Sequence, residues 1–208
     1  MTSFTVSARV AQVLSSYVSA SFGVMGNGNV YFLDAAEKQG LRFTPVRHEG
    51  AAIAAADAYY RASGRLAAGT TTYGPGYTNA LTALAEAVQA QIPVVLVTGD
   101  APTSGARPWD VDQAGEDARA RRTAGVLAIP YDLATREAPD EELPEPTAPN
   151  VTDGIDRSLG LAARMLAGAK RPLILAGRGA HLAGAGPELR GLADRGGALT
   201  AGPDLATN

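Results

Sequence analysis

The stretch TPVRHEGAAIAAADAYYRASG, residues 44–64, decides the fold prediction. It begins inside the apolar pattern of a short strand, LRFTPV, residues 41–46. From Glu49 it continues in small apolar residues that suit a helix ending near Ser63. A strand that leads directly into a helix is the repeating unit of a parallel sheet, because parallel neighbours need a crossover connection. One carboxylate, Glu49, stands at the junction.

The same alternation extends on both sides of this stretch. Segments 21–26, 41–46, 66–73 and 93–99 have the pattern of strands, and segments 30–40, 49–63 and 77–90 that of helices. A further helix is indicated before the first strand, where valines and leucine recur at helical spacing. These elements predict an α/β fold, with a parallel sheet flanked by helices on both faces.

The composition changes near residue 139, where prolines and carboxylates alternate without an apolar period. We therefore expect a first domain at 1–138 and a linker at 139–152. Residues 153–208 hold a helix pattern at 155–167, the strand RPLILAG and a helix pattern at 187–194. This is too little for a complete doubly wound domain, so it predicts part of a second α/β domain.

Composition excludes several classes of function. The 208 residues are 46% hydrophobic and carry a net charge of −3 without a basic tract, which argues against nucleic acid as a partner. The chain has no cysteine and two histidines, so we expect no metal site in it. No segment approaches the roughly 20 apolar residues that span a bilayer, so we expect a cytoplasmic protein without a membrane partner.

Three turns fall at the predicted strand ends, the edge at which parallel sheets carry their sites: GNGN, HEG and GPG. Each has a plain structural explanation. An acidic residue such as Glu49 is favoured in the first turn of a helix, and glycine, asparagine and proline are ordinary turn residues. The small residues after Glu49 either allow tight packing on the sheet or leave room for a flat ligand. No Walker, G-x-G-x-x-G or G-x-S-x-G pattern is present.

The order of the motifs is more specific than any one of them. FGVMGNGN, VRHEGAAIAAADAYYRASG, TTYGPGYTNALTALAEAVQAQIPVVLVTGD and VDQAGED follow one another, and the sequence resembles the pyrimidine-binding domain of the thiamine-diphosphate enzymes, in the branch with acetolactate synthase and the 2-keto-acid decarboxylases. The resemblance covers residues 1 to about 130 and implies the thiamine-diphosphate-binding fold. The segment GVLAIPYDL looks like the last strand of that domain, and residues 155–208 look like the start of the family's central domain.

The resemblance also implies roles for individual residues. Glu49 would hydrogen-bond N1′ of the cofactor's aminopyrimidine and favour the imino form, whose 4′ nitrogen can take the proton from C2. Gln113 would be an active-site glutamine. Asn27 and Gly28 would face the substrate. The pyrimidine pocket would be lined by Gly74, Pro75, Gly76 and Asn79.

The family's cofactors are thiamine diphosphate and Mg²⁺, and a flavin, FAD, occurs in some members without being indicated here. The G-D-G pattern that holds Mg²⁺ and the diphosphate is missing from this chain. The resemblance therefore implies that a diphosphate-binding domain comes from a further C-terminal part or a separate subunit, in a dimer or tetramer. This chain alone should be inactive.

Two departures bear on the reaction. Simple decarboxylases of the family carry aspartate where Asn27 stands and a histidine pair near DVDQ, and this chain has neither. We therefore expect an acetolactate synthase-like carboligase, a transferase or lyase that decarboxylates a small 2-keto acid and transfers the acyl carbanion to a second carbonyl compound. The alternatives are a decarboxylase that releases aldehyde, a non-catalytic assembly subunit, and a free-standing nucleotide-binding module.

Overall fold

The computed structural model describes residues 4–104, 125–138 and 155–202, and the chain divides into two compact units, residues 1–142 and 143–208. The first unit contains a five-stranded sheet in the order β2-β1-β3-β4-β5, in which every pair is parallel. This confirms the predicted α/β class. The strands are β1 Ser21–Gly23, β2 Phe43–Pro45, β3 Ala68–Thr71, β4 Val95–Asp100 and β5 Gly125–Pro130.

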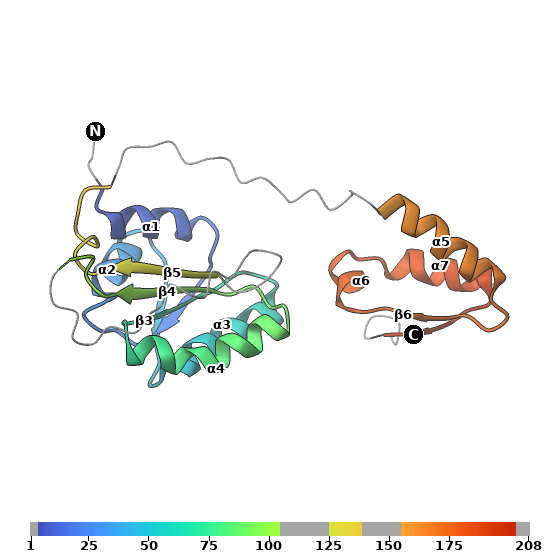
Figure 1. The fold of residues 1–208 in the computed structure, drawn as a ribbon, viewed down its shortest axis with the longest axis horizontal. Coiled ribbons are helices and arrows are strands. Elements are labelled where there is room, and N and C mark those ends of the chain that lie inside the picture. The colour runs from blue at the N-terminus through green and yellow to red at the C-terminus, as the bar shows by residue number, and fades with distance from the viewer. Residues whose placement is uncertain (1–3, 105–124, 139–154, 203–208) are drawn as a thin grey trace. The chain divides into compact units, whose positions relative to one another are not determined.

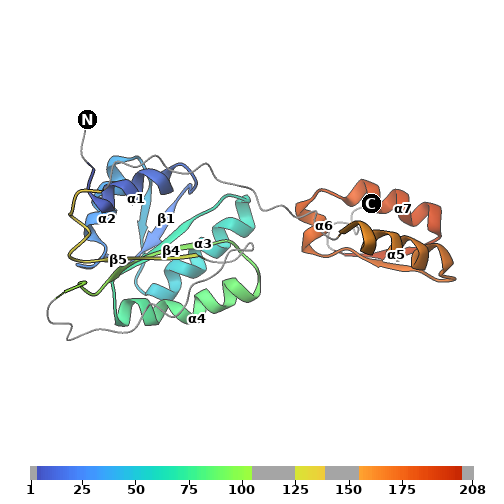
Figure 2. The same cartoon turned by 45° about the horizontal axis from the view of Figure 1, so that its top comes forward.

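Helices cover both faces of this sheet (Figures 1 and 2). Helices α1, Val6–Ser15, and α2, Val30–Lys38, lie on one face, and α3, Glu49–Ser63, and α4, Pro75–Gln89, lie side by side on the other. Residues of β4 alternate between the two cores: Val97 joins the cluster under α1 and α2, and Leu96 joins the cluster under α3 and α4. Each face therefore buries its own apolar layer.

Helix α3 begins at the predicted junction for a local reason. The His48 side chain accepts a hydrogen bond of 3.0 Å from the backbone N–H of Gly50, which caps the helix. The small residues of α3 allow tight packing, since Ala52 and Ala56 are fully buried. A Cβ atom on Gly69 of β3 would lie 2.6 Å from Ile53 of the helix. Of the two explanations for this alanine-rich stretch, tight packing and room for a flat ligand, the structure supports tight packing on the sheet.

The chain leaves two neighbouring strands, β1 and β3, towards opposite faces of the sheet. β1 leads into α2 on one face, whereas its neighbour β3 leads into α4 on the other face. In open parallel sheets, ligands bind in the crevice outside the carboxyl ends of strands at such a reversal. The turns after β1 and β3, residues 24–29 and 72–74, lie at this reversal.

The second unit contains α5 Ile155–Gly168, β6 Leu173–Leu175, α6 Arg178–Leu182, α7 Gly186–Gly196 and β7 Leu199–Ala201, with β6 and β7 parallel. The predicted helix at 155–167, the strand and the helix at 187–194 are present, and α6 was not predicted. Within the described ranges, none of the helices has the length and apolar character that crossing a bilayer requires.

Candidate functional site

Glu49 and Asn79 bring the beginnings of α3 and α4 together. The Asn79 side-chain amide donates a hydrogen bond of 3.1 Å to Oε2 of Glu49. Glu49 is half-buried, and no residue that the structure describes donates a hydrogen bond to its Oε1. One carboxylate oxygen is thus held in place, and the other is available to a ligand.

The GPG turn lies beside this carboxylate. Gly74 has φ 63° and ψ −122°, a conformation that favours glycine, and Pro75 takes the first position of α4. The helix therefore begins two residues earlier than predicted. Gly76 is buried, and a Cβ atom there would lie 3.6 Å from Oε1 of Glu49 and 2.8 Å from Cγ2 of Thr72. The turn consequently presents bare backbone next to the carboxylate.

The loop after β1 is tied to the residues just after β3. The Asn27 amide nitrogen donates to the Tyr73 hydroxyl at 3.2 Å, and the Thr72 hydroxyl donates to Oδ1 of Asn27 at 3.3 Å. The backbone N–H of Gly28 donates to the same Thr72 hydroxyl at 3.2 Å. Asn27 is exposed, whereas Gly28 is buried against the Tyr73 ring. Of the two residues expected to face the substrate, Asn27 is the accessible one.

The buried side chain of Asn29 anchors this loop to β3. Its side chain is 1% exposed and donates to the Thr70 hydroxyl at 2.9 Å and to the Val24 carbonyl at 3.1 Å. Its Oδ1 accepts from the Gly26 N–H at 2.8 Å. All of these are groups of β3 or of the turn itself, so the turn is anchored to the neighbouring strand.

The structure brings most of the predicted residues to one edge of the sheet. Glu49, the GPG turn and Asn79 form one cluster, and Asn27 and Gly28 reach it through Thr72. Gln113 lies outside the described residues. Among the described residues, no group of three or more His, Cys, Asp or Glu side chains could hold a metal ion.

Thr72, Tyr73 and Asn29 were not identified from the sequence. The run TTTY directly before GPG is an available signal, because alternate residues of a buried strand point to opposite faces and a polar run at its end must find partners. Their hydrogen bonds join the turn after β1 to the end of β3 and the residues just after it, 41 to 46 residues away in the chain. That pairing depends on the register of β1 with β3.

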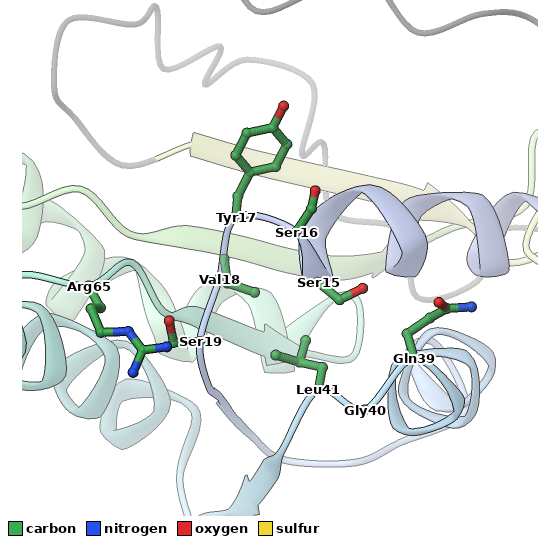
Figure 3. A pocket seen from close by; sticks show the side chains of 9 residues that line it. All are labelled: Ser15, Ser16, Tyr17, Val18, Ser19, Gln39, Gly40, Leu41 and Arg65. Atoms are coloured by element: carbon green, nitrogen blue, oxygen red, sulfur yellow. The ribbon is translucent and has the colours of Figure 1, made fainter.

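Two hollows lie away from this cluster. One of about 290 Å³ lies at the opposite edge of the sheet, where the chain enters β1, β2 and β3 (Figure 3). Its lining residues are Ser15, Ser16, Tyr17, Val18, Ser19, Gln39, Gly40, Leu41 and Arg65. A second, of about 510 Å³, lies between α2 and β2. Neither is lined by a predicted site residue.

Comparison with known proteins gives a family match. Residues 4–136 match the sequence model described as thiamine pyrophosphate enzyme, N-terminal TPP binding domain. A sulfoacetaldehyde acetyltransferase of Castellaniella defragrans is 32% identical over 91% of this chain and 36% of its own length. The protein named probable acetolactate synthase large subunit in Methanococcus aeolicus is 31% identical over 85% of this chain and 36% of its own. The 2-hydroxyacyl-CoA lyase 2 of Danio rerio is 42% identical over 45% of this chain and 15% of its own.

A solved structure shares the fold. It is titled as a thiamin diphosphate-dependent enzyme from Mycobacterium smegmatis, and it matches 95% of this chain and 44% of its own with a TM-score of 0.77 at 21% identity. At that identity the likeness concerns the fold. The chain spans about a third of the length of the first two relatives.

Proposed function

This chain belongs to the family of thiamine pyrophosphate enzymes, and we propose on that premise that it is the pyrimidine-binding part of a carboligase acting on a small 2-keto acid. The observation that carries the proposal is the Glu49 carboxylate, with one oxygen held by Asn79 and the other open beside the GPG turn. The activity of the whole protein also needs the diphosphate-binding domain and its Mg²⁺, contributed by a partner region in a dimer or tetramer.

The residues present fit an aminopyrimidine ring. A flat heterocycle needs a surface without side chains, and Gly74 and Gly76 supply one, since a Cβ on Gly76 would already collide with Thr72. Oε1 of Glu49 lies at the border of this surface and can hold the proton shared with the ring nitrogen. Pro75 is exposed and can contact the ring face. The cofactor then supplies the electron sink that decarboxylation of a 2-keto acid requires.

Asn79 orients Glu49 in this proposal. Its amide proton occupies Oε2, so a proton brought to the carboxyl group is directed to Oε1, on the side of Gly76. A fixed carboxyl group that exchanges one proton with a ring nitrogen acts as a general acid and base, which contributes typically about 10²–10⁴-fold to rate.

The loop at Asn27 favours carbon–carbon bond formation over release of aldehyde. Releasing aldehyde requires a proton donor at the reacting carbon. Asn27 offers an amide, which does not titrate, and both of its polar atoms are already engaged with Thr72 and Tyr73. A second carbonyl compound can therefore compete for the reacting carbon. The names of the relatives, an acetyltransferase, a synthase and a lyase, accord with a transferase or lyase reaction of this kind.

The test compares Glu49→Gln with Glu86→Gln in the purified protein in its native assembly. Glu86 is an exposed glutamate of α4 away from the site, so it controls for the charge change. With thiamine diphosphate and Mg²⁺ present, we expect Glu49→Gln to slow exchange of the cofactor's C2 proton, followed by NMR, by at least about 100-fold. Unchanged exchange would refute the role of Glu49 and favour a non-catalytic assembly subunit.

The proposed carboligase reaction is tested with pyruvate, in the presence and absence of excess acceptor aldehyde. We expect a joined product whenever acceptor is present. Free acetaldehyde as the main product under acceptor excess would show a decarboxylase instead.

A further inference from the structure

We propose that Thr72 is a positioning residue that serves the substrate loop with its hydroxyl group and the cofactor turn with its methyl group. The proposal rests on the proposed function, because it assigns Asn27 to the substrate side and the GPG turn to the cofactor side. It adds a residue that connects the two.

The hydroxyl group faces the loop after β1. It donates to Oδ1 of Asn27 at 3.3 Å and accepts from the Gly28 N–H at 3.2 Å. One hydroxyl thus fixes both the side chain of Asn27 and the backbone of the next residue. Tyr73 completes the arrangement by accepting from the Asn27 amide nitrogen at 3.2 Å, so the plane of this amide is set at both ends.

The methyl group faces the GPG turn. A Cβ on Gly76 would come within 2.8 Å of Cγ2 of Thr72, so this methyl group fills the space under the turn. The same hypothetical atom would lie 3.6 Å from Oε1 of Glu49. The Thr72 methyl group therefore supports the backbone that borders the open carboxylate oxygen.

Neither group of Thr72 can move independently of the other. Threonine is branched at Cβ, so a rotation that withdrew the hydroxyl from Asn27 would also withdraw the methyl group from Gly76. The backbone is held too, because the Thr98 hydroxyl lies 3.1 Å from the Thr72 carbonyl oxygen. The lack of a side chain at Gly26 makes room for Thr72, since a Cβ there would lie 2.9 Å from the Thr72 Cβ. One rotamer of one residue consequently sets the positions of two loops.

Two near-isosteric substitutions separate the two groups in the native assembly. Thr72→Val removes the hydroxyl and keeps a methyl group under the turn. Thr72→Ser keeps the hydroxyl and removes the methyl group. Four quantities are measured for each: deuterium uptake of residues 24–30 by mass spectrometry, the Kd for thiamine diphosphate with Mg²⁺ by calorimetry, and kcat and KM with pyruvate at saturating cofactor.

We expect opposite patterns from the two variants. Thr72→Val should raise deuterium uptake of the loop and raise KM by about fivefold, the size of one lost hydrogen bond, with the cofactor Kd within about twofold of the parent. Thr72→Ser should raise the cofactor Kd by about fivefold, the effect of losing one buried methyl group, and leave loop uptake and KM within about twofold. In an Asn27→Ala background, Thr72→Val should add little to KM.

Equal effects of both variants on loop uptake, cofactor Kd and KM would mean a general structural role and would overturn the proposal. So would a Thr72→Val protein with unchanged loop uptake. Failure of the proposed function gives a different result: if the parent protein binds no thiamine diphosphate, or Glu49→Gln leaves C2 exchange unchanged, both proposals fall. If Glu49→Gln abolishes exchange and the Thr72 variants do not separate, only the role of Thr72 is refuted.

Discussion

Asn79 and Glu49, 30 residues apart in the chain, are joined by a hydrogen bond of 3.1 Å between the Asn79 amide nitrogen and Oε2 of Glu49. This bond connects the second turn of α4 to the first turn of α3. It selects which carboxylate oxygen remains available at the GPG turn. The orientation of Glu49 therefore depends on a residue of the neighbouring helix.

Replacing Asn79 with alanine should weaken cofactor binding. The variant loses the hydrogen bond that orients the Glu49 carboxylate, so we expect the Kd for thiamine diphosphate to rise by about fivefold, the size of one ordinary hydrogen bond. Because Asn79 is exposed, the melting temperature should change little. Gln89→Ala, which removes an exposed amide from the far end of α4, is the calorimetric control. An unaltered Kd in Asn79→Ala would show that Glu49 needs no such support.

Gly76→Ala should destabilise the first unit. The added methyl group would lie 2.8 Å from the stiff side chain of Thr72, so the turn or the threonine must shift, at a cost of about 1–3 kcal/mol. Gly125→Ala is the matched control, because a Cβ there meets nothing within 4 Å and should change stability by less than about 0.5 kcal/mol. Chemical denaturation of both variants measures the difference. Equal stabilities would contradict the close contact.

Asn29→Ala should lower the free energy of unfolding, although we expect no contact between Asn29 and a ligand. The change removes the buried hydrogen bond to the Thr70 hydroxyl and the partly buried bonds to the Gly26 N–H and the Val24 carbonyl, which costs at least about 2 kcal/mol. Asn27→Ala, two residues earlier and exposed, should cost less than about 1 kcal/mol. Denaturant unfolding of the pair tests the contrast, and a smaller loss for Asn29→Ala than for Asn27→Ala would be inconsistent with the anchored turn.

Asp132, just after β5, provides a prediction on pH. The Thr103 hydroxyl, and then the Thr103 backbone N–H at 2.9 Å, donate to its carboxylate and lower the pKa of Asp132 below its ordinary value of 3.8. A lowered pKa in the folded state means that this interaction stabilises the protein above about pH 4, and that the stabilisation is lost as the pH falls through the folded-state pKa.

Removing the Thr103 hydroxyl should move that titration. In Thr103→Val we expect the pKa of Asp132 to rise towards 3.8, followed by NMR of its carboxyl carbon. The stability difference between the parent and the variant should shrink in acid. Thr82→Val, at an exposed position of α4, should leave the titration of Asp132 in place. If both variants titrate like the parent, the Thr103 contact does not determine this pKa.

Much of the architecture follows from local sequence patterns. The start of α3 at Glu49 was predicted to the residue, because the change from strand to helix periodicity coincides with the residue that follows a capping side chain, His48. The start of α4 was placed at Tyr77 rather than Pro75, because GPG was interpreted wholly as a turn. Proline at the first helical position needs no N–H partner, so the helix can begin inside the motif.

The polar contacts of the site were not predictable in the same way. That Asn27 meets Thr72 and Tyr73 follows from the pairing of β1 with β3, in which Gly23 lies opposite Thr70. Nothing local in GNGN distinguishes the exposed Asn27 from the buried Asn29, since both residues tolerate turn conformations. Site residues could be proposed from family resemblance, but the neighbours that hold them required the register of the sheet.

Two glycines limit how this site could be redesigned. A Cβ on Gly99, near the end of β4, would fall 2.6 Å from the backbone of Gly28, so the main chains of β4 and of the loop after β1 lie close together. A side chain on Gly99 would force these two segments apart, and a side chain on Gly28 would collide with Thr72 and Tyr73. Engineers seeking room for bulkier reactants should instead vary Tyr73, whose side chain can be shortened while the backbone stays in place.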